Sequence, residues 1–193
     1  RQQYVCHRQE DQNSFTFCAL GEKFAWDAGY GHYGVPFRHY RDTDVHNAIL
    51  IDGCGQNSYN DRRWSRGHMA EFRQTPEWTY ALGDARRCYG INGAIARADR
   101  HFLFRRGTFP WLMILDDVIA DEDEHDVTWN FVTHPGNRIE QDPKRGFLVR
   151  GARADMRLII RAPGALAVRQ DMVGEMPRLQ LTQRARRARC ASR

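Results

Sequence analysis

The sequence lacks long apolar segments and a recognisable leader. It contains no apolar run of about eighteen residues or more, which is the length that a membrane-spanning helix requires, so no membrane span is expected. The chain opens with the polar residues Arg1-Gln2-Gln3-Tyr4, which do not form a secretory signal. It also does not begin with Met, and we therefore expect a piece of a larger polypeptide.

The cysteines do not form a recognisable framework. Their number is odd, and no two of them have CxxC or zinc-finger spacing: Cys6, Cys18, Cys54, Cys88 and Cys190. Free or buried thiols are favoured over disulfides. The cysteines therefore leave the cellular compartment open.

Lysine is nearly absent, since only Lys23 and Lys144 occur, and arginine supplies almost all of the positive charge behind the net charge of +5. A guanidinium group can bind carboxylate, sulfate or phosphate through two hydrogen bonds, so an acidic polymer is one possible partner. A bias in the composition of the gene explains the same excess and is the favoured reading. No pattern of an RNA-recognition motif or zinc finger is present, and no nucleic-acid partner is expected.

Amphipathic helices of useful length are also missing. Short apolar runs instead recur every eight to twelve residues between turn residues, a pattern typical of antiparallel sheets packed face to face. The sequence therefore predicts an all-β fold, an antiparallel β-sandwich, in one domain over residues 1–182 with a frayed basic tail over 183–193. The expected hairpins join 101–106 to 111–119 around Gly107, and 145–150 to 154–161 across Gly151.

Residues that can carry chemistry concentrate in the first fifty positions, where His7, Asp11, Asp27 and His46 are assigned to three strands and a loop. Imidazole and carboxylate groups from neighbouring strands suit a divalent ion such as Zn²⁺. Spacing alone does not separate a metal site from ordinary hydrogen-bonded structure, which is the commoner outcome.

Several segments resemble a known family in both order and spacing. HRQEDQNSF (7–15), GEKFAWDAG (21–29) and DVHNAILIDGCGQ (44–56) look like the "HxHxDxxSF", "GxxxxxDxG" and "HNxxxxDGxxQ" blocks of the heparinase II/III C-terminal domain. RHFLFRRG (100–107), WLMILDDV (111–118) and VTWNFVTH (127–134) resemble further segments of the same domain. The resemblance covers roughly residues 4–180.

This resemblance implies a β-sandwich of the multi-stranded supersandwich type that follows an α/α toroid in whole enzymes. It implies a lyase that cleaves uronic-acid polysaccharides, of the heparan sulfate or alginate kind, by β-elimination in a cleft between the two domains. The catalytic Tyr would come from the toroid, and the enzyme would be periplasmic or secreted. The alternative is a non-catalytic module that binds acidic carbohydrate.

Carried over by position, the resemblance makes His7 the catalytic histidine of the cleft and assigns a zinc site to Gln9, Asp27 and His46. Gln9 is a departure, because the family has a second His there and a glutamine carbonyl is a poor Zn²⁺ ligand. The site is therefore expected to be weakened, to hold another ion, or to consist of residues hydrogen-bonded to one another.

Three further residues are candidates for contact with the substrate: Arg8, Tyr30 and Arg38. Surface solvation explains the arginines about as well, and packing within the loop explains most of its tyrosines. Three other histidines have no motif support and are expected to be structural: His68, His101 and His125.

Overall fold

The structure is a computed structural model that describes residues 9–36, 39–56, 67–89, 95–120, 124–143 and 146–185. Strands dominate these ranges, and their helical content consists of two short 3₁₀ turns, η1 (Thr43–Val45) and η2 (Arg86–Cys88). No helix in the described ranges has the length and apolar character needed to cross a membrane. The expected all-β class is confirmed.

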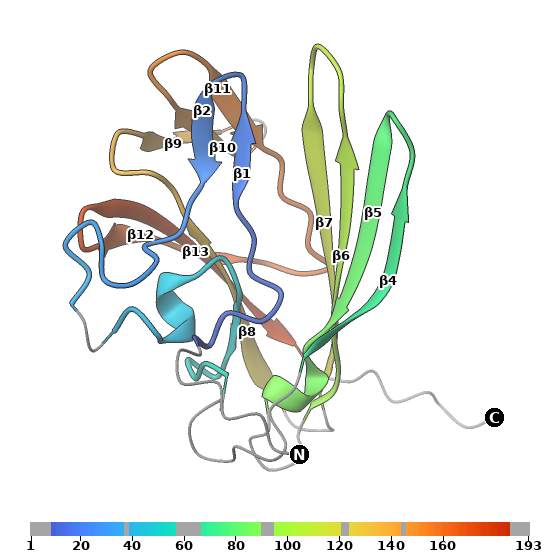
Figure 1. Cartoon of the computed structure of the whole chain (residues 1–193). Helices are drawn as coiled ribbons and strands as arrows, with labels where there is room; N and C mark the ends of the chain where they lie inside the picture. The colour runs from blue at the N-terminus through green and yellow to red at the C-terminus, as the bar shows by residue number, and fades with distance from the viewer. Residues whose placement is uncertain are drawn as a thin grey trace.

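One layer is a four-stranded antiparallel sheet in the order β4-β5-β6-β7 (Figure 1). Its strands follow one another in sequence and pair as successive hairpins: β4 (His68–Gln74), β5 (Trp78–Asp84), β6 (Ile95–Arg105) and β7 (Trp111–Ala120). Gly107 lies in the β6–β7 connection at a φ of 128°, which a residue with a side chain rarely adopts. The hairpin predicted around Gly107 is therefore confirmed.

The second layer contains a four-stranded sheet in the order β12-β13-β8-β3. Its members come from distant parts of the sequence: β3 (Ile49–Ile51), β8 (His125–Val132), β12 (Ala167–Val173) and β13 (Met176–Ala185). Strand β13 continues past the expected domain boundary at residue 182. The short strand β3 pairs with β8, which fixes the loop on either side of it to this sheet.

Two smaller antiparallel sheets extend this side of the molecule (Figure 1). The first has the order β11-β10-β9, and the second is the hairpin β1-β2: β9 (Arg138–Asp142), β10 (Gly146–Arg150), β11 (Asp155–Leu158), β1 (Phe17–Ala19) and β2 (Glu22–Ala25). Strands β10 and β11 pair across Gly151, as expected. The layers face the β4–β7 sheet, so the structure is a sandwich of antiparallel sheets.

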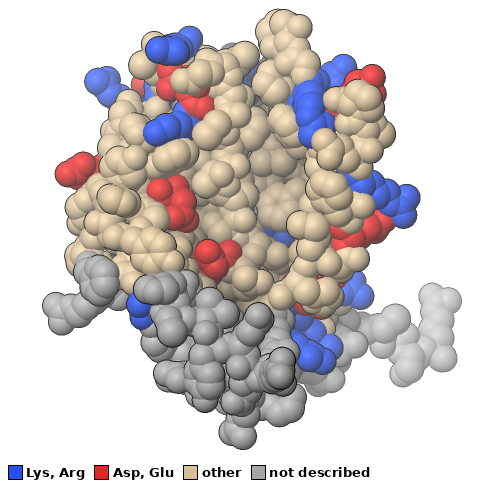
Figure 2. Space-filling view, viewed as in Figure 1, with Lys and Arg blue, Asp and Glu red and all other residues tan. Residues whose placement is uncertain are grey.

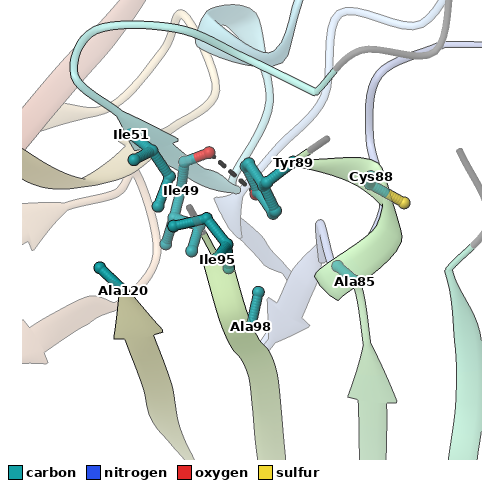
Figure 3. Packing of buried hydrophobic residues seen from close by; sticks show 8 residues of the cluster. All are labelled: Ile49, Ile51, Ala85, Cys88, Tyr89, Ile95, Ala98 and Ala120. Carbon is teal, nitrogen blue, oxygen red and sulfur yellow. Dashed lines mark hydrogen bonds between the residues drawn. The ribbon is translucent and has the colours of Figure 1, made fainter. Parts of the chain in front are cut away.

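Where the two layers meet, β3 and the start of β6 share an apolar cluster (Figure 3). Ile49 and Ile51 pack there with Ile95, and Tyr89 donates a hydrogen bond from its hydroxyl to the Ile49 carbonyl (2.9 Å). Tyr89 is 2% exposed, and burial raises the pKa of its hydroxyl above the usual range, so it remains a neutral donor. The cluster therefore packs β3 of the second layer against the start of β6 in the first layer.

Farther along, the layers diverge and leave an apolar groove of about 560 Å³. Its walls include Phe17, Trp111, Trp129 and Leu158, which come from both sides of the sandwich. Figure 2 shows the corresponding hollow in the middle of this face, bordered mainly by uncharged residues.

Candidate functional site

Three segments of the first sixty residues meet beside the second layer: 9–15 before β1, 26–30 after β2, and 43–56 around β3. The buried side chain of Gln56 forms two hydrogen bonds with the backbone of Gln12. Its Oε1 accepts from the Gln12 N–H (2.9 Å), and its Nε2 donates to the Gln12 carbonyl (2.8 Å). Such paired backbone contacts hold a segment in a fixed register. The segment that carries Gln9 is therefore fixed to the loop after β3.

Asn47 joins all three segments through one fully buried side chain. Its Nδ2 donates to the carbonyls of Phe15 and Trp26 (both 2.8 Å), and its Oδ1 accepts from the Val132 N–H (2.6 Å). A buried amide with all of these partners satisfied both rigidifies and specifies a local structure. Asn130, also fully buried, donates in turn to the carbonyl of His46 (2.5 Å).

Arg100, only 2% exposed, ties the same segments to the opposite sheet. Its guanidinium forms two bonds with Asp116 on β7, from Nε to Oδ1 (2.6 Å) and from Nη2 to Oδ2 (3.0 Å). Its Nη1 donates to the carbonyls of Asn13 (2.8 Å) and Asn47 (2.6 Å). The loops of the site are thus fixed to both layers of the sandwich.

These framework residues were not singled out from the sequence, although signals for most of them exist. Asn47 and Gln56 stand in the block over 44–56, and Arg100 opens the segment over 100–107. In the structure, these three side chains are buried and form hydrogen bonds that connect the segments of the site. Asn130 lies in the segment over 127–134 without a signal that separates it from its neighbours.

Asp27 and His46 form the closest pair of expected site residues. His46 is fully buried, and its Nδ1 lies 2.7 Å from Oδ2 of Asp27, while Oδ1 of Asp27 accepts the Gly29 N–H (2.7 Å). Burial raises the pKa of Asp27, but the hydrogen bond and charge of His46 together with the Gly29 N–H bring it below its usual range. Asp27 is therefore an anion near neutral pH, and Nδ1 of His46 is the donor.

Gln9 lies beside this pair. Its Nε2 donates to the Gly29 carbonyl (2.9 Å), which places its side chain on the turn that begins at Asp27. The structure thus brings Gln9, Asp27 and His46 together, although none of the three lies in a strand. The strand that follows His46 begins only at Ile49, because η1 turns the chain first and His46 ends that turn with a hydrogen bond from its N–H to the Thr43 carbonyl (3.1 Å).

The described donors do not fit a zinc ion shared by Asp27 and His46. The carboxylate contacts Nδ1, and the remaining nitrogen, Nε2, faces away from Nδ1 across the ring. Within the described ranges, Nε2 has no hydrogen-bond partner, and no group of three His, Cys, Asp or Glu side chains that could hold a metal is found. A catalytic zinc site needs about three protein ligands that point at one spot.

Of the three residues expected to contact the substrate, Tyr30 is the one that lies within the described ranges. It lies in the loop after Asp27 with 51% of its surface exposed, and its ring centre is 5.3 Å from that of the buried Tyr40. Three other expected site residues lie outside the described residues: His7, Arg8 and Arg38.

An aromatic cluster flanks the turn at Asp27. Trp26 packs edge-to-face on His134, with ring centres 5.9 Å apart, and Lys23 lies over the Trp26 ring. Burial, followed by the charge of Lys23, lowers the pKa of His134. This histidine is therefore neutral near pH 7 and packs as an aromatic ring at the end of β8.

On the face drawn in Figure 2, the described arginines do not gather into one basic surface. Figure 2 shows blue and red side chains interspersed on the visible face. Many described arginines pair with carboxylates of this chain: Arg97 with Asp117, Arg100 with Asp116, Arg150 with Glu140 and Asp155, Arg178 with Asp171, and Arg184 with Glu124. The positive charge by itself therefore does not identify a polyanion site.

Comparisons with known proteins agree with the fold and with the family that the sequence resembles. A crystal structure of a mutant of the heparan sulfate lyase HepC from Pedobacter heparinus superposes with a TM-score of 0.63 at 11% identity, over 92% of this chain and 28% of that one. The chain thus corresponds to little more than a quarter of that lyase. No curated protein sequence matches. The family model described as "Heparinase II/III-like, C-terminal" matches residues 2–191, and the chain belongs to this family.

Proposed function

We propose that this chain is the β-sandwich domain of a lyase that cleaves uronic-acid-containing polysaccharides, of the heparan sulfate or alginate type, by β-elimination. The observation that carries the proposal is the family match over residues 2–191. It is supported by a fold similar to that of a heparan sulfate lyase. We further propose that the protein works in the periplasm or outside the cell.

The reaction defines what such a domain must supply. A base removes the proton at C5 of the uronate, the bond from C4 to the leaving oxygen breaks, and a C4–C5 double bond forms. A general acid protonates the departing oxygen, and the uronate carboxylate must be neutralised so that the C5 proton becomes acidic enough. We assign the acid and base work to a Tyr of an α/α toroid and a cleft role to His7 of this domain.

The described residues support the role of this domain as a fixed frame for a site. The network of Asn47, Gln56 and Arg100 holds the segments on both sides of the turn at Asp27. Catalytic groups need positions fixed to within about 0.5 Å, which buried hydrogen bonds provide. In this proposal the domain presents His7 and Tyr30 to the substrate from a rigid frame, and the toroid completes the cleft.

The test uses the native polypeptide that carries this domain. It is incubated with heparan sulfate, heparin and alginate, and the ultraviolet absorbance of the unsaturated uronate is followed. The expected result is unsaturated product from at least one of these polymers. Saturated products from any of them would show hydrolysis and would refute the proposal, as would intact polymers throughout.

A second candidate is a non-catalytic module for acidic carbohydrate. The exposed ring of Tyr30 favours it, because an aromatic face can lie against a sugar ring. Titration of the native polypeptide with the same polymers distinguishes the two functions. Saturable binding without unsaturated product favours the module, whereas binding followed by unsaturated product favours the lyase.

A further inference from the structure

The two nitrogens of His46 have separate environments. Nδ1 is held by Asp27 at 2.7 Å, and Nε2 is buried on the far side of the ring. An ion bound at Nε2 is beyond the reach of that carboxylate, and an ion bound at Nδ1 must displace the proton that the hydrogen bond uses. The observed bond and an ion shared by these two residues therefore exclude each other.

The same residues form a continuous chain of hydrogen bonds. Gln9 Nε2 donates to the Gly29 carbonyl (2.9 Å), the Gly29 N–H donates to Asp27 (2.7 Å), and Asp27 accepts from His46 (2.7 Å). The carbonyl of His46 then accepts from Asn130 on β8 (2.5 Å). This path crosses from the N-terminal segment, through the turn after β2, to the second sheet.

We propose that Gln9, Asp27 and His46 form a metal-independent clamp that cross-links these three segments. A bound ion would connect segments by taking a ligand from each of them. Here hydrogen bonds make the connections instead: the Gln9 amide donates to the Gly29 carbonyl, and the Asp27 carboxylate accepts from His46. Burial strengthens such bonds because water does not compete for them. The clamp is independent of the lyase proposal, since it concerns what holds the loops.

The test measures metal content and heat stability of the purified full chain. Elemental analysis is expected to find zinc and other transition metals far below one ion per chain. The thermal midpoint is expected to be the same in buffer, with a chelator, and with added zinc. A stoichiometric ion whose removal by the chelator lowers the midpoint would overturn the proposal.

Gln9→Met tests the clamp itself, because methionine has a similar size and cannot donate to Gly29. The matched control is Gln74→Met at the end of β4, where the glutamine is exposed. We expect Gln9→Met to melt about 2–4 °C below the control, which corresponds to one lost hydrogen bond, and to do so equally with and without chelator. Equal midpoints for the two variants would overturn the role of Gln9.

Discussion

Replacing Arg100 with methionine removes the guanidinium that joins the loops of the site to the β4–β7 sheet, while much of the side-chain volume is kept. Arg100 is 2% exposed and makes two bonds to Asp116 and two to backbone carbonyls. The Asp116 side chain, 22% exposed, and the carbonyls of Asn13 and Asn47 lose these partners in the variant. The cost therefore comes from the partners left behind rather than from a cavity.

The magnitude follows from the burial of those partners. Breaking a buried ion pair costs about 3–5 kcal/mol, and a carbonyl left unpaired costs at least about 1 kcal/mol. The residual exposure of Asp116 lets water recover part of its solvation. We expect Arg100→Met to lower the free energy of unfolding by about 4 kcal/mol, or the thermal midpoint by about 8–16 °C.

Urea unfolding followed by tryptophan fluorescence measures this change, provided that the slope of the transition stays constant. The matched control is Arg97→Met on the same strand. Arg97 pairs with Asp117 at 2.6 Å, but its side chain is 48% exposed, and no measurable loss is expected. A loss at Arg100 no larger than that at Arg97 would refute the reasoning.

Three further outcomes are expected. The hydrogen bonds from Arg178 hold the pKa of Asp171 below its usual range despite its burial. Above a pH of about 4, Asp171→Asn should therefore lower the free energy of unfolding, measured in urea, by about 1 kcal/mol. The difference from the parent should shrink as the pH falls below that value, because the parent carboxylate then becomes protonated. Asn47→Ala leaves two carbonyls and one N–H without their buried partner and should cost about 3 kcal/mol in the same assay, so an unchanged midpoint would contradict its bridging role. Tyr30→Ala should raise the Kd for an acidic polysaccharide several-fold, about 1 kcal/mol in calorimetry, whereas Tyr30→Phe keeps the ring and should bind as the parent does.

The strands were predictable where local patterns decide the structure. Gly107 and Gly151 mark turns between apolar runs, and the hairpins form there because short connections favour antiparallel neighbours. The 3₁₀ turn at Arg86–Cys88 follows β5 in a stretch whose sequence does not separate a helical turn from a loop.

The meeting of the site residues could not be worked out from spacing. His46 was assigned to a strand, but η1 turns the chain just before it and leaves it outside β3. The contact between Asp27 and His46 depends on Asn47, which bridges backbone groups far apart in the sequence. Long-range hydrogen bonds of this kind leave no periodic signal, and the resemblance to family blocks pointed to the pair instead. Its functional role stays a prediction.

The most direct test of the proposed function compares His7→Ala with His68→Ala in the native polypeptide, with heparan sulfate and alginate as substrates. The His68 side chain is 64% exposed on β4, so its loss serves as the control. The proposal predicts that unsaturated uronate forms at the parent rate in the control and falls by about 100-fold or more in His7→Ala with the fold intact. Undiminished elimination by His7→Ala, or no elimination by the parent, would contradict it.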